Sequence, residues 1–287
     1  MEPETESEME LKTLLLERED RVAWITLHRP HRLNAWTGRM HTEYRWLLEQ
    51  LDGDPDVGVI VVTGAGRGFC AGADAKALSG HVEKGGYDPG TPARLARPGH
   101  GVRDEFEADF AYQFGLSKPM IAAINGPAAG VGLVLACFCD LRFAARGAVL
   151  TTAHGKLGLP AEFGLSWLLP RIVGLTHAND WLLTSRRVSA EEAKAAGLLN
   201  DVFEPEALRA RVSEFARELA TSVSPASLRE TKGQIYTDLH RDVGSSVRHA
   251  NLRIDEMMRE VDYREGVAAL QAKRPPAYPV KPGGDEA

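Results

Sequence analysis

A chain of 287 residues in which 44% are apolar is long enough to bury a large core without disulfides or metals. Its net charge of −6 and pI near 5.9 argue against general nucleic-acid binding, because such binding depends on a basic surface that neutralises phosphates. The longest apolar runs are too short to span a bilayer, and the N-terminus is acidic where a signal or transit peptide would be basic. We therefore expect a cytoplasmic protein with no nucleic-acid or membrane partner.

The cysteines are Cys70, Cys137 and Cys139, and they lie among apolar, glycine and alanine residues. Their odd number and their surroundings favour buried, reduced thiols over disulfides or a zinc site. The sequence therefore predicts no metal.

The first part of the chain has the pattern of a disordered tail followed by a hairpin. Residues 1–10 alternate glutamate with small or apolar residues and are expected to be disordered. Residues 11–16 and 21–27 are short strand-like runs on either side of a charged break at residues 17–20. Asn34 is a candidate N-cap for the amphipathic helix that carries Met40, Tyr44 and Leu48.

A β-branched run at residues 57–63 predicts a strand buried on both faces, and a glycine-rich turn at residues 64–74 follows it. A short helical run over residues 74–78 comes next. Residues 79–103 are rich in Gly, Pro, His and Arg and have no periodicity, as is typical of a lid or binding loop. Phe106, Phe110 and Phe114 then recur four apart, which predicts one face of a helix that packs in the core more often than it lines a pocket.

The central stretch predicts a strand, a tight turn and a helix. Met120–Ile124 has strand character, Asn125 to Pro127 form the turn, and glycines flank the start of a helix over Val131–Cys137. The first amides of a helix lack partners and carry the positive end of its dipole, so the Val131 N–H is a candidate for half of an oxyanion hole. The alternative is a close-packed junction that needs small residues. Neither a dinucleotide fingerprint nor a P-loop is present.

The remainder of the chain becomes helical. A strand at residues 148–152, a loop at 154–164 and an apolar run at 165–173 precede a capping box that starts at Ser189. From Pro205 the pattern predicts helices over residues 206–221, 225–239, 243–260 and 264–270. We therefore expect an α/β core over residues 11–204 and a helical region over residues 205–287.

Four segments resemble the crotonase, or enoyl-CoA hydratase/isomerase, superfamily. They are residues 67–74 (RGFCAGAD), residues 125–132 (NGPAAGVG) with 139–144 (CDLRFA), residues 28–35 (HRPHRLNA) and residues 273–276 (KRPP). The resemblance implies a ClpP/crotonase-like spiral of β-β-α units, with a C-terminal helical region that packs into trimers, often paired as hexamers. It also implies an acyl-CoA substrate, with coenzyme A as part of that substrate and no further cofactor.

The same resemblance assigns roles to single residues. The N–H groups of Ala73 and Val131 would hold the thioester oxygen of an acyl-CoA as it becomes an enolate, and pre-aimed donors of this kind are commonly the largest catalytic term. Residues placed around the CoA phosphates and adenine are Arg32, Leu33, Ala71, Asp74 and Lys76. For Arg32 a solvated surface charge is an equal alternative. Asp140 and Arg142 are expected to form a structural turn and an ion pair.

The chain departs from the hydratases of the superfamily, which use two glutamates. Val134 and His154 stand where those glutamates are expected. Glu162, eight residues before Pro170, has instead the spacing of the glutamate in peroxisomal-type Δ3,Δ2-enoyl-CoA isomerases, in which one carboxylate moves the proton. In an apolar pocket beside Phe163 and Trp167 its pKa would rise toward neutrality, whereas a glutamate that faces solvent would have no catalytic role.

Several functions stay open on this reasoning. The first is double-bond isomerisation by Glu162, and the second is hydration by Glu162 with help from His154 as an acid/base group. His154 is alternatively a hydrogen-bonded residue that fills space. A catalytically silent acyl-CoA binder and an RNA-binding protein are further alternatives, and the negative charge disfavours the last.

Overall fold

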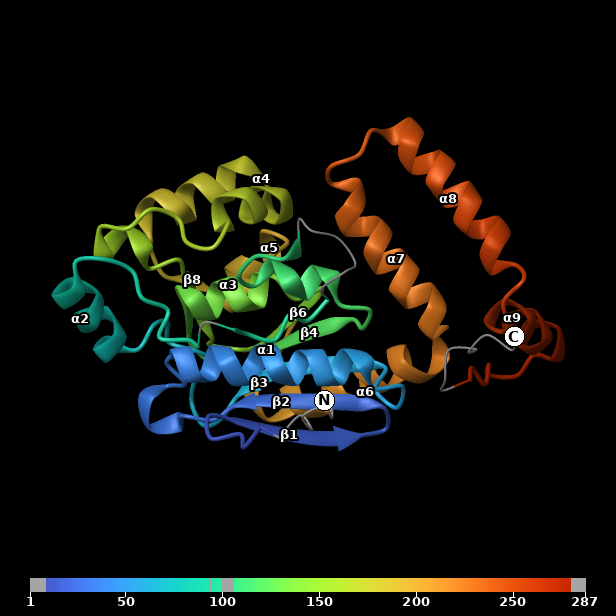
Figure 1. Cartoon of the computed structure of the whole chain (residues 1–287), viewed down its shortest axis with the longest axis horizontal. Helices are drawn as coiled ribbons and strands as arrows, with labels where there is room; N and C mark the ends of the chain where they lie inside the picture. The colour runs from blue at the N-terminus through green and yellow to red at the C-terminus, as the bar shows by residue number, and fades with distance from the viewer. Residues whose placement is uncertain (1–8, 93, 100–105, 280–287) are drawn as a thin grey trace, which may run out of the picture.

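The computed structural model describes residues 9–92, 94–99 and 106–279 (Figure 1). Residues 1–8 of the predicted tail lie outside this range. The strands are β1 (Leu14–Glu19), β2 (Val22–Leu27), β3 (Val59–Gly64), β4 (Met120–Ile124), β5 (Ala128–Ala129), β6 (Leu141–Ala145), β7 (Val149–Thr151), β8 (Val188–Ser189) and β9 (Asp201–Phe203). The helices are α1 (Gly38–Gly53), α2 (Ala75–Lys84), α3 (Val131–Cys137), α4 (Leu165–Thr184), α5 (Ala190–Ala195), α6 (Pro205–Ser222), α7 (Pro225–Asp238), α8 (Val243–Met257) and α9 (Val261–Ala272). Short 3₁₀ turns cover Pro30–Arg32, Ala111–Gly115 and His154–Leu157.

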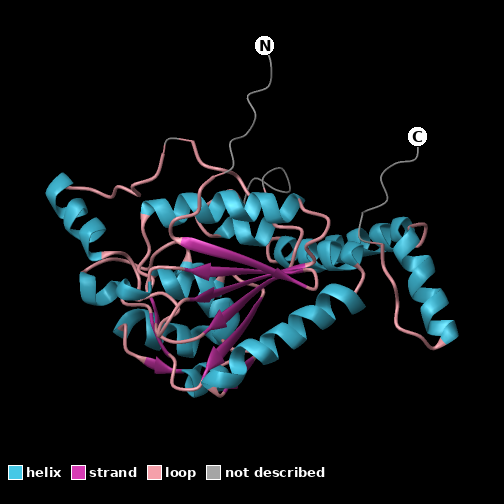
Figure 2. Ribbon diagram, turned by 90° about the horizontal axis from the view of Figure 1, so that it is seen from below, coloured by secondary structure: helices cyan, strands magenta, loops and turns pink. Residues whose placement is uncertain are grey.

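The described strands form a six-stranded sheet in the order β1-β2-β3-β4-β6-β9, and β5, β7 and β8 form a smaller sheet. In the larger sheet β1 is antiparallel to β2, and the remaining neighbours are parallel. The strands lie between layers of helices (Figure 2), which explains why β3 and β4 are apolar on both faces. This arrangement, with its helical C-terminal region, confirms the predicted α/β class.

Each face of the large sheet has its own apolar cluster. The larger cluster contains residues of α1, α3 and α4, among them Tyr44, Leu135 and Trp181. On the opposite face, α6 packs Val212 and Ala216 against the strands. Helix α6, the first in the region from residue 205 onward, therefore completes the core, whereas α7 to α9 extend beyond it (Figure 1).

Two predictions near the N-terminus are wrong. Residues 17–19 belong to β1, and the turn of the hairpin is Asp20–Arg21, where φ is +48° and +65°. Such mirror-image turns match the twist of paired strands, so a charged stretch can continue in an exposed edge strand. Helix α1 is capped by Thr37, which accepts from the Met40 N–H, and not by Asn34. The buried Asn34 amide donates to Ala65 and Gly68 carbonyls and so ties the preceding loop to the glycine-rich turn.

The predicted aromatic helix face is also wrong. Phe106, Phe110 and Phe114 are buried, but no α-helix joins them in the described residues 106–115. A 3₁₀ turn covers Ala111–Gly115, and Phe110 before it has a φ of +64° that a helix cannot accommodate. Helix α2 is longer than predicted and takes up the start of the segment at residues 79–103. Residues 93 and 100–103 of that segment lie outside the described residues.

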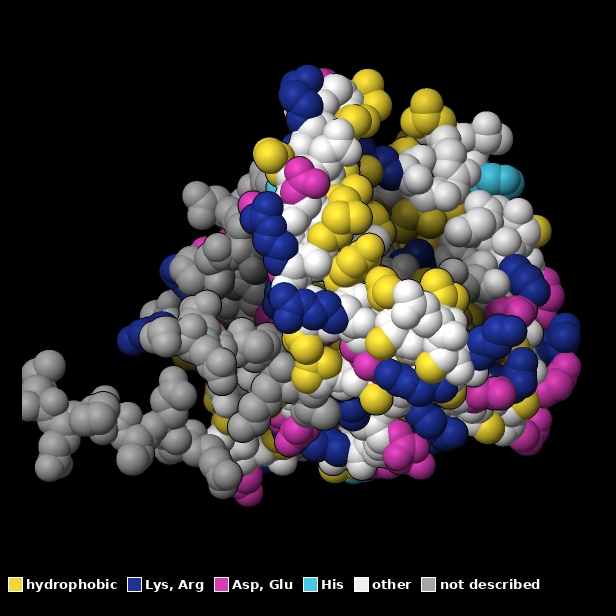
Figure 3. Space-filling view, turned by 90° about the vertical axis from the view of Figure 1, so that its right-hand side faces the viewer, with side chains coloured by type: hydrophobic (Ala, Val, Ile, Leu, Met, Phe, Trp, Pro, Cys, Tyr) yellow, Lys and Arg dark blue, Asp and Glu magenta, His cyan; other side chains and the backbone are white. Residues whose placement is uncertain are grey.

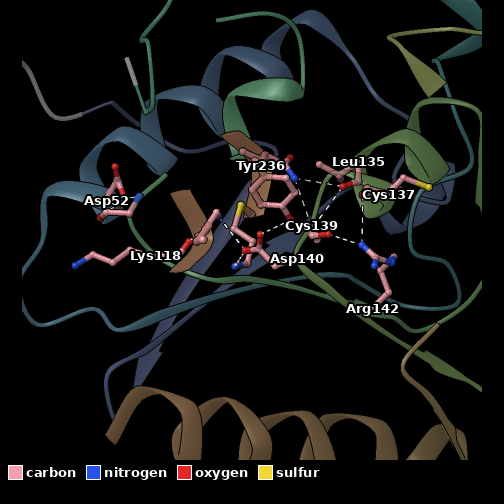
Figure 4. A network of polar contacts seen from close by, with 12 residues as sticks. Asp52, Lys118, Leu135, Cys137, Cys139, Asp140, Arg142 and Tyr236 are labelled. Carbon is pink, nitrogen blue, oxygen red and sulfur yellow. Dashed lines mark hydrogen bonds and ion pairs between the residues drawn. The ribbon is translucent and has the colours of Figure 1, made fainter. Parts of the chain in front are cut away.

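A polar network fixes α7 to the core (Figure 4). The Asp140 carboxylate accepts from Lys232 Nζ at 2.9 Å, from the Tyr236 hydroxyl at 2.6 Å and from the Met120 N–H at 2.6 Å. Arg142 donates instead to backbone carbonyls, including Leu198 O at 2.8 Å. The predicted Asp140–Arg142 ion pair is therefore wrong, because the partner of Asp140 comes from α7.

Two predictions made from the composition concern the cysteines and membrane-spanning segments. Cys70, Cys137 and Cys139 are buried free thiols, as expected. In the part of the chain that the structure describes, no helix combines the length and the apolarity that crossing a bilayer requires.

Candidate active site

Two glycine-rich turns, at residues 64–74 and 125–132, pack directly against each other. The Ala129 N–H donates to the Cys70 carbonyl at 2.9 Å, and the Cys70 N–H donates to the Pro127 carbonyl at 3.1 Å. A Cβ atom at Gly132 would lie 2.2 Å from the Cys70 carbonyl oxygen, far inside van der Waals contact. Glycine is therefore required for this approach, which brings the end of the first turn beside the start of α3.

Ala73 and Val131 occupy the two ends of that junction and line one cavity of about 460 Å³. Val131 is the first residue of α3, and Ala73 precedes Asp74, the N-cap of α2. Among the described residues, neither main-chain N–H donates to a protein acceptor. The two residues that carry these free donors therefore border one cavity, as the donor residues of an oxyanion hole must.

The walls of this cavity, called the catalytic cavity below after the role that we propose for it, are mainly apolar. The rings of Trp36, His41, Phe110 and Phe163 line one part, and α2 with the turn after it supplies Leu78, Tyr87 and others. Phe110 therefore lines the cavity as well as the core. The described part of the segment at residues 79–103 contributes to this lining, and its role as a lid or binding loop stays a prediction.

Glu162 lies in the same cavity, close to the start of α3. A Cβ atom built on Gly130 would be 3.6 Å from Glu162 Oε2, so the carboxylate is adjacent to the Gly130–Val131 peptide. Burial raises the pKa of Glu162 above its ordinary value, and nearby His154 partly opposes this shift. A base that must also return a proton needs such a shift.

His154 lies outside the residues that line the cavity. Its side chain is 5% exposed, and within the described structure its buried Nδ1 has no hydrogen-bond partner. Its influence on the pKa of Glu162 places it near that carboxylate. Val134, at the other position where a glutamate was expected, is fully buried in α3.

A family model described as "Enoyl-CoA hydratase/isomerase" matches residues 17–281. The chain belongs to this family. It is 35% identical to the 1,2-epoxyphenylacetyl-CoA isomerase of Escherichia coli strain K12 over 281 residues, which are 93% of this chain and 98% of the relative. Among solved structures it is similar to the enoyl-CoA hydratase of Bacillus anthracis, with a TM-score of 0.80, 28% identity and coverage of 94% and 100%. A second similar structure is the enoyl-CoA hydratase of Mycobacterium tuberculosis H37Rv, with a TM-score of 0.80, 27% identity and coverage of 94% and 99%.

Membership of this family makes the chain an acyl-CoA enzyme of the hydratase or isomerase type. The residues predicted to surround CoA, namely Arg32, Leu33, Ala71, Asp74 and Lys76, are not in the lining of the cavity. The Ala71 N–H donates to the Leu33 carbonyl at 3.0 Å, so those two segments are in contact. The Asp74 carboxylate accepts from the Lys76 N–H at 2.9 Å and pairs with Arg29, also at 2.9 Å. Asp74 thus has a structural partner, whereas Arg32 and Lys76 are exposed.

Sequence reasoning missed His41 and Trp36 in the cavity wall. The signal was present for His41, because it stands three residues before Tyr44 and seven before Leu48 and so shares their buried helix face. Burial lowers the pKa of His41 to about 4, an effect that Asp109 opposes and Arg45 reinforces. The ring is therefore neutral at physiological pH, and its Nε2 lies 3.7 Å from Asp109 Oδ1.

Proposed function

We propose that this enzyme moves a double bond along an acyl-CoA, with Ala73 and Val131 as the oxyanion donors and Glu162 as the proton carrier. The observation that carries this proposal is the position of the Glu162 carboxylate. It shares one cavity with both free N–H groups and is adjacent to Gly130.

The reaction needs one base. The thioester oxygen of a 3-enoyl-CoA accepts hydrogen bonds from the two amides, and Glu162 removes a proton from C2. Electrons of that C–H bond form a dienolate whose charge rests on the oxygen, where one pre-aimed donor is worth about 10²–10³ in rate. The protonated Glu162 then returns the proton to C4, the double bond ends between C2 and C3, and the carboxylate is regenerated.

Hydration by Glu162 and His154 is the second candidate. The unpartnered Nδ1 of His154 favours it, since this buried imidazole has a free nitrogen and lies near Glu162. Against it, His154 is not among the residues that line the cavity. Isomerisation therefore has the better geometric support.

The acyl group is proposed to be apolar, because the walls of the cavity are mainly apolar. The E. coli relative is named for an isomerase of 1,2-epoxyphenylacetyl-CoA, whose acyl group carries a ring system. Here the Trp36, His41, Phe110 and Phe163 rings line the cavity, which supports testing cyclic as well as linear thioesters. The reaction as proposed requires no metal and no cofactor other than the CoA of its substrate.

Assembly into trimers, or into hexamers of paired trimers, is also proposed. Apolar side chains gather on the face formed by α7 to α9 (Figure 3). Exposed members of this face include Val243, Leu252, Ile254 and Leu270, which are between 52% and 80% exposed. An apolar surface of this kind is typical of a subunit interface. Mass measurement in solution would test the proposed assembly.

The decisive experiment compares wild type with Glu162→Gln on 3-enoyl-CoA and 2-enoyl-CoA. Loss of a general base lowers the rate by about 10²–10⁴, so Glu162→Gln should abolish isomerisation, whereas exposed Glu218→Gln on α6 should match wild type. Equal sensitivity of 2-enoyl-CoA hydration to Glu162→Gln and His154→Asn would favour hydration. Undiminished turnover of both substrates by Glu162→Gln would remove Glu162 from the mechanism. Binding of CoA thioesters without turnover across the panel would support a silent site.

A further inference from the structure

The segment that carries the first proposed oxyanion donor is held by the backbone of Trp36. The Trp36 N–H donates to the Gly72 carbonyl at 2.8 Å, and the Trp36 carbonyl accepts from the Asp74 N–H at 3.0 Å. These two bonds make Trp36 and Ala73 partners in an isolated parallel bridge. They lie on either side of Ala73, whose own N–H takes no part in them.

The bond to Gly72 fixes the direction of the Ala73 N–H. The Gly72 carbonyl and the Ala73 N–H belong to one peptide group, which is planar and trans, so the two groups point in opposite directions. Because the carbonyl points toward the Trp36 N–H, the Ala73 N–H points away from it. A rotation of this peptide group would turn both groups together. The aim of the donor therefore depends on where the Trp36 N–H is held.

The Trp36 N–H is held in turn by a side chain, that of Arg29. This N–H shares a peptide group with the Ala35 carbonyl, and the Ala35 carbonyl accepts from Arg29 Nη1 at 2.6 Å. The guanidinium, the Ala35–Trp36 peptide and the Gly72–Ala73 peptide thus form a relay of hydrogen bonds. The positive charge lies at one end of this relay, and the N–H proposed to stabilise the enolate lies at the other.

Arg29 is fixed by further contacts. Its Nη2 pairs with the Asp74 carboxylate at 2.9 Å, and the two side chains are only 19% and 11% exposed. Its main-chain N–H donates to Asn34 Oδ1 at 2.9 Å, and its carbonyl accepts from the Asn34 N–H at 3.0 Å. Burial acts to raise the pKa of Asp74, but hydrogen bonds from the Lys76 N–H and from Arg29 lower it below its ordinary value. Asp74 is therefore charged at neutral pH and keeps the guanidinium in place.

The relay has two physical effects on the Ala73 N–H. It orients the donor before the substrate arrives, which is the condition for a strong oxyanion site. It also polarises the donor, because hydrogen bonds in a chain strengthen one another by about 10–30% per bond. Since the Asp74 carboxylate offsets part of the charge of Arg29, orientation is the effect on which the proposal depends. The second donor is oriented differently, because the carbonyl of the Gly130–Val131 peptide accepts from the Val134 N–H at 3.0 Å within α3.

We propose that Arg29 is a positioning residue of the reaction, which holds the Ala73 N–H toward the thioester oxygen through two peptide groups. The proposal rests on the proposed function, since it takes Ala73 as an oxyanion donor. Damage to the relay should weaken the binding of an enolate more than that of a ground-state thioester, because the aim of the donor matters most where charge has accumulated.

Two conservative variants break the relay at different points. Arg29→Lys keeps the positive charge but loses the planar fork with which one guanidinium reaches both Ala35 and Asp74. Asp74→Asn keeps a good N-cap for α2 and removes the charged partner of Arg29. The double variant tests whether both act through one relay. Arg217→Lys is the matched control, because Arg217 also forms an ion pair at 2.9 Å, with Asp20, and lies exposed on α6 outside the lining of the catalytic cavity.

The measurement compares a ground-state thioester with an enolate. The first probe is butanoyl-CoA. The second is acetoacetyl-CoA, which becomes an enolate when the carbon between its two carbonyl groups loses a proton to solvent. Calorimetry gives the dissociation constant of each, and the ultraviolet absorbance of the enolate against pH gives the pKa of the bound acetoacetyl-CoA. The values of kcat and KM for 3-enoyl-CoA are measured alongside, and circular dichroism checks folding.

Loss of a whole oxyanion donor costs about 10²–10³ in rate, so a misaligned donor in Arg29→Lys should lower kcat about tenfold. The pKa of bound acetoacetyl-CoA should rise by about one unit, the equivalent of a tenfold loss of enolate affinity. KM and the affinity for butanoyl-CoA should change much less. Asp74→Asn should shift the same quantities in the same direction, and the double variant should lose no more than Arg29→Lys. Arg217→Lys should match wild type.

Two results would overturn the proposal. One is a folded Arg29→Lys variant in which the pKa of bound acetoacetyl-CoA equals that of wild type, and the other is an equal loss of affinity for butanoyl-CoA and for the enolate. If Arg29→Lys does not fold, Asp74→Asn is judged by the same two criteria. Failure of the proposed reaction is distinguishable, because the binding measurements need no turnover. An enzyme without isomerase activity that shows the expected pKa shift would refute the isomerase mechanism and retain the relay.

A wild-type protein that does not lower the pKa of acetoacetyl-CoA below its value in solution would refute the oxyanion hole itself, and the role of Arg29 with it.

Discussion

Replacing His41 by glutamine tests the electrostatics of the catalytic cavity. Burial lowers the pKa of His41 from 6.5 to about 4, with Asp109 opposing the shift and Arg45 reinforcing it. Between these two values the unfolded chain binds a proton that the folded chain does not. The free energy of unfolding therefore rises with pH through this window and is lost as the pH falls through it.

The size of the effect follows from the shift itself. At 1.36 kcal/mol per pKa unit, the difference between 6.5 and about 4 corresponds to about 3 kcal/mol. The side chain is only 6% exposed and stacks on Phe110 at 5.7 Å, so solvent screens it little. Asp109 and Arg45 are the charged groups that face the ring, and both remain in the variant.

Urea denaturation of wild type and His41→Gln from neutral pH down to about pH 4 measures the effect, because the variant lacks this titration. As the pH falls over that range, the free energy of unfolding of wild type should decrease by about 3 kcal/mol more than that of the variant. Exposed His31→Asn is the control and should track wild type. Parallel curves for wild type and His41→Gln would refute the assignment of a depressed pKa to His41.

Three further predictions follow from single contacts. Because burial raises the pKa of Glu162 above 4.5, the acid limb of the pH profile of kcat/KM should lie above pH 4.5. Glu162→Gln should also stabilise the fold at neutral pH, because it removes a buried charge. Calorimetry should show that this gain vanishes below pH 4.5, where Glu162 is protonated in both the folded and the unfolded chain. Gly132→Ala places a Cβ 2.2 Å from the Cys70 carbonyl and should cost about 1–3 kcal/mol in thermal unfolding with a loss of turnover, whereas a fully active, equally stable variant would contradict the close approach. Lys232→Met leaves the Asp140 carboxylate without its cation and should cost about 3–5 kcal/mol in denaturant unfolding, while an unchanged midpoint would show that the ion pair does not anchor α7.

Much of the fold was predictable because its signals are local. The β-branched run that becomes β3 needs burial on both faces wherever it lies, and the helix over Val131–Cys137 follows from glycines and small apolar residues in sequence. Ser189 caps α5 through a bond to the Glu192 N–H, as its spacing from that residue predicted. The position of Glu162 in the catalytic cavity was likewise anticipated, though only through its spacing from Pro170 and the family resemblance.

Other features were decided by contacts between distant parts of the chain. Asparagine is a residue type that often caps helices, but the side-chain amide of Asn34 donates to the carbonyls of Ala65 and Gly68, more than thirty residues away. The cation that pairs with Asp140 is Lys232 on α7, 92 residues later in the chain, and not the nearby Arg142. Local patterns specify which element a segment prefers, and they cannot specify which buried donor a distant element will bring to it.

The sequence by itself therefore determined the family, the α/β class and the candidate proton carrier, because these depend on periodicity, turn chemistry and motif spacing. Only the tertiary structure decided that His41 is a neutral wall residue of the cavity and that the rings of Phe110 and Phe163 meet in the same wall. Both depend on burial by segments far apart in the chain, namely α1, the residues around Phe110 and the loop before α4. Desolvation and ring packing exist only once those segments have met.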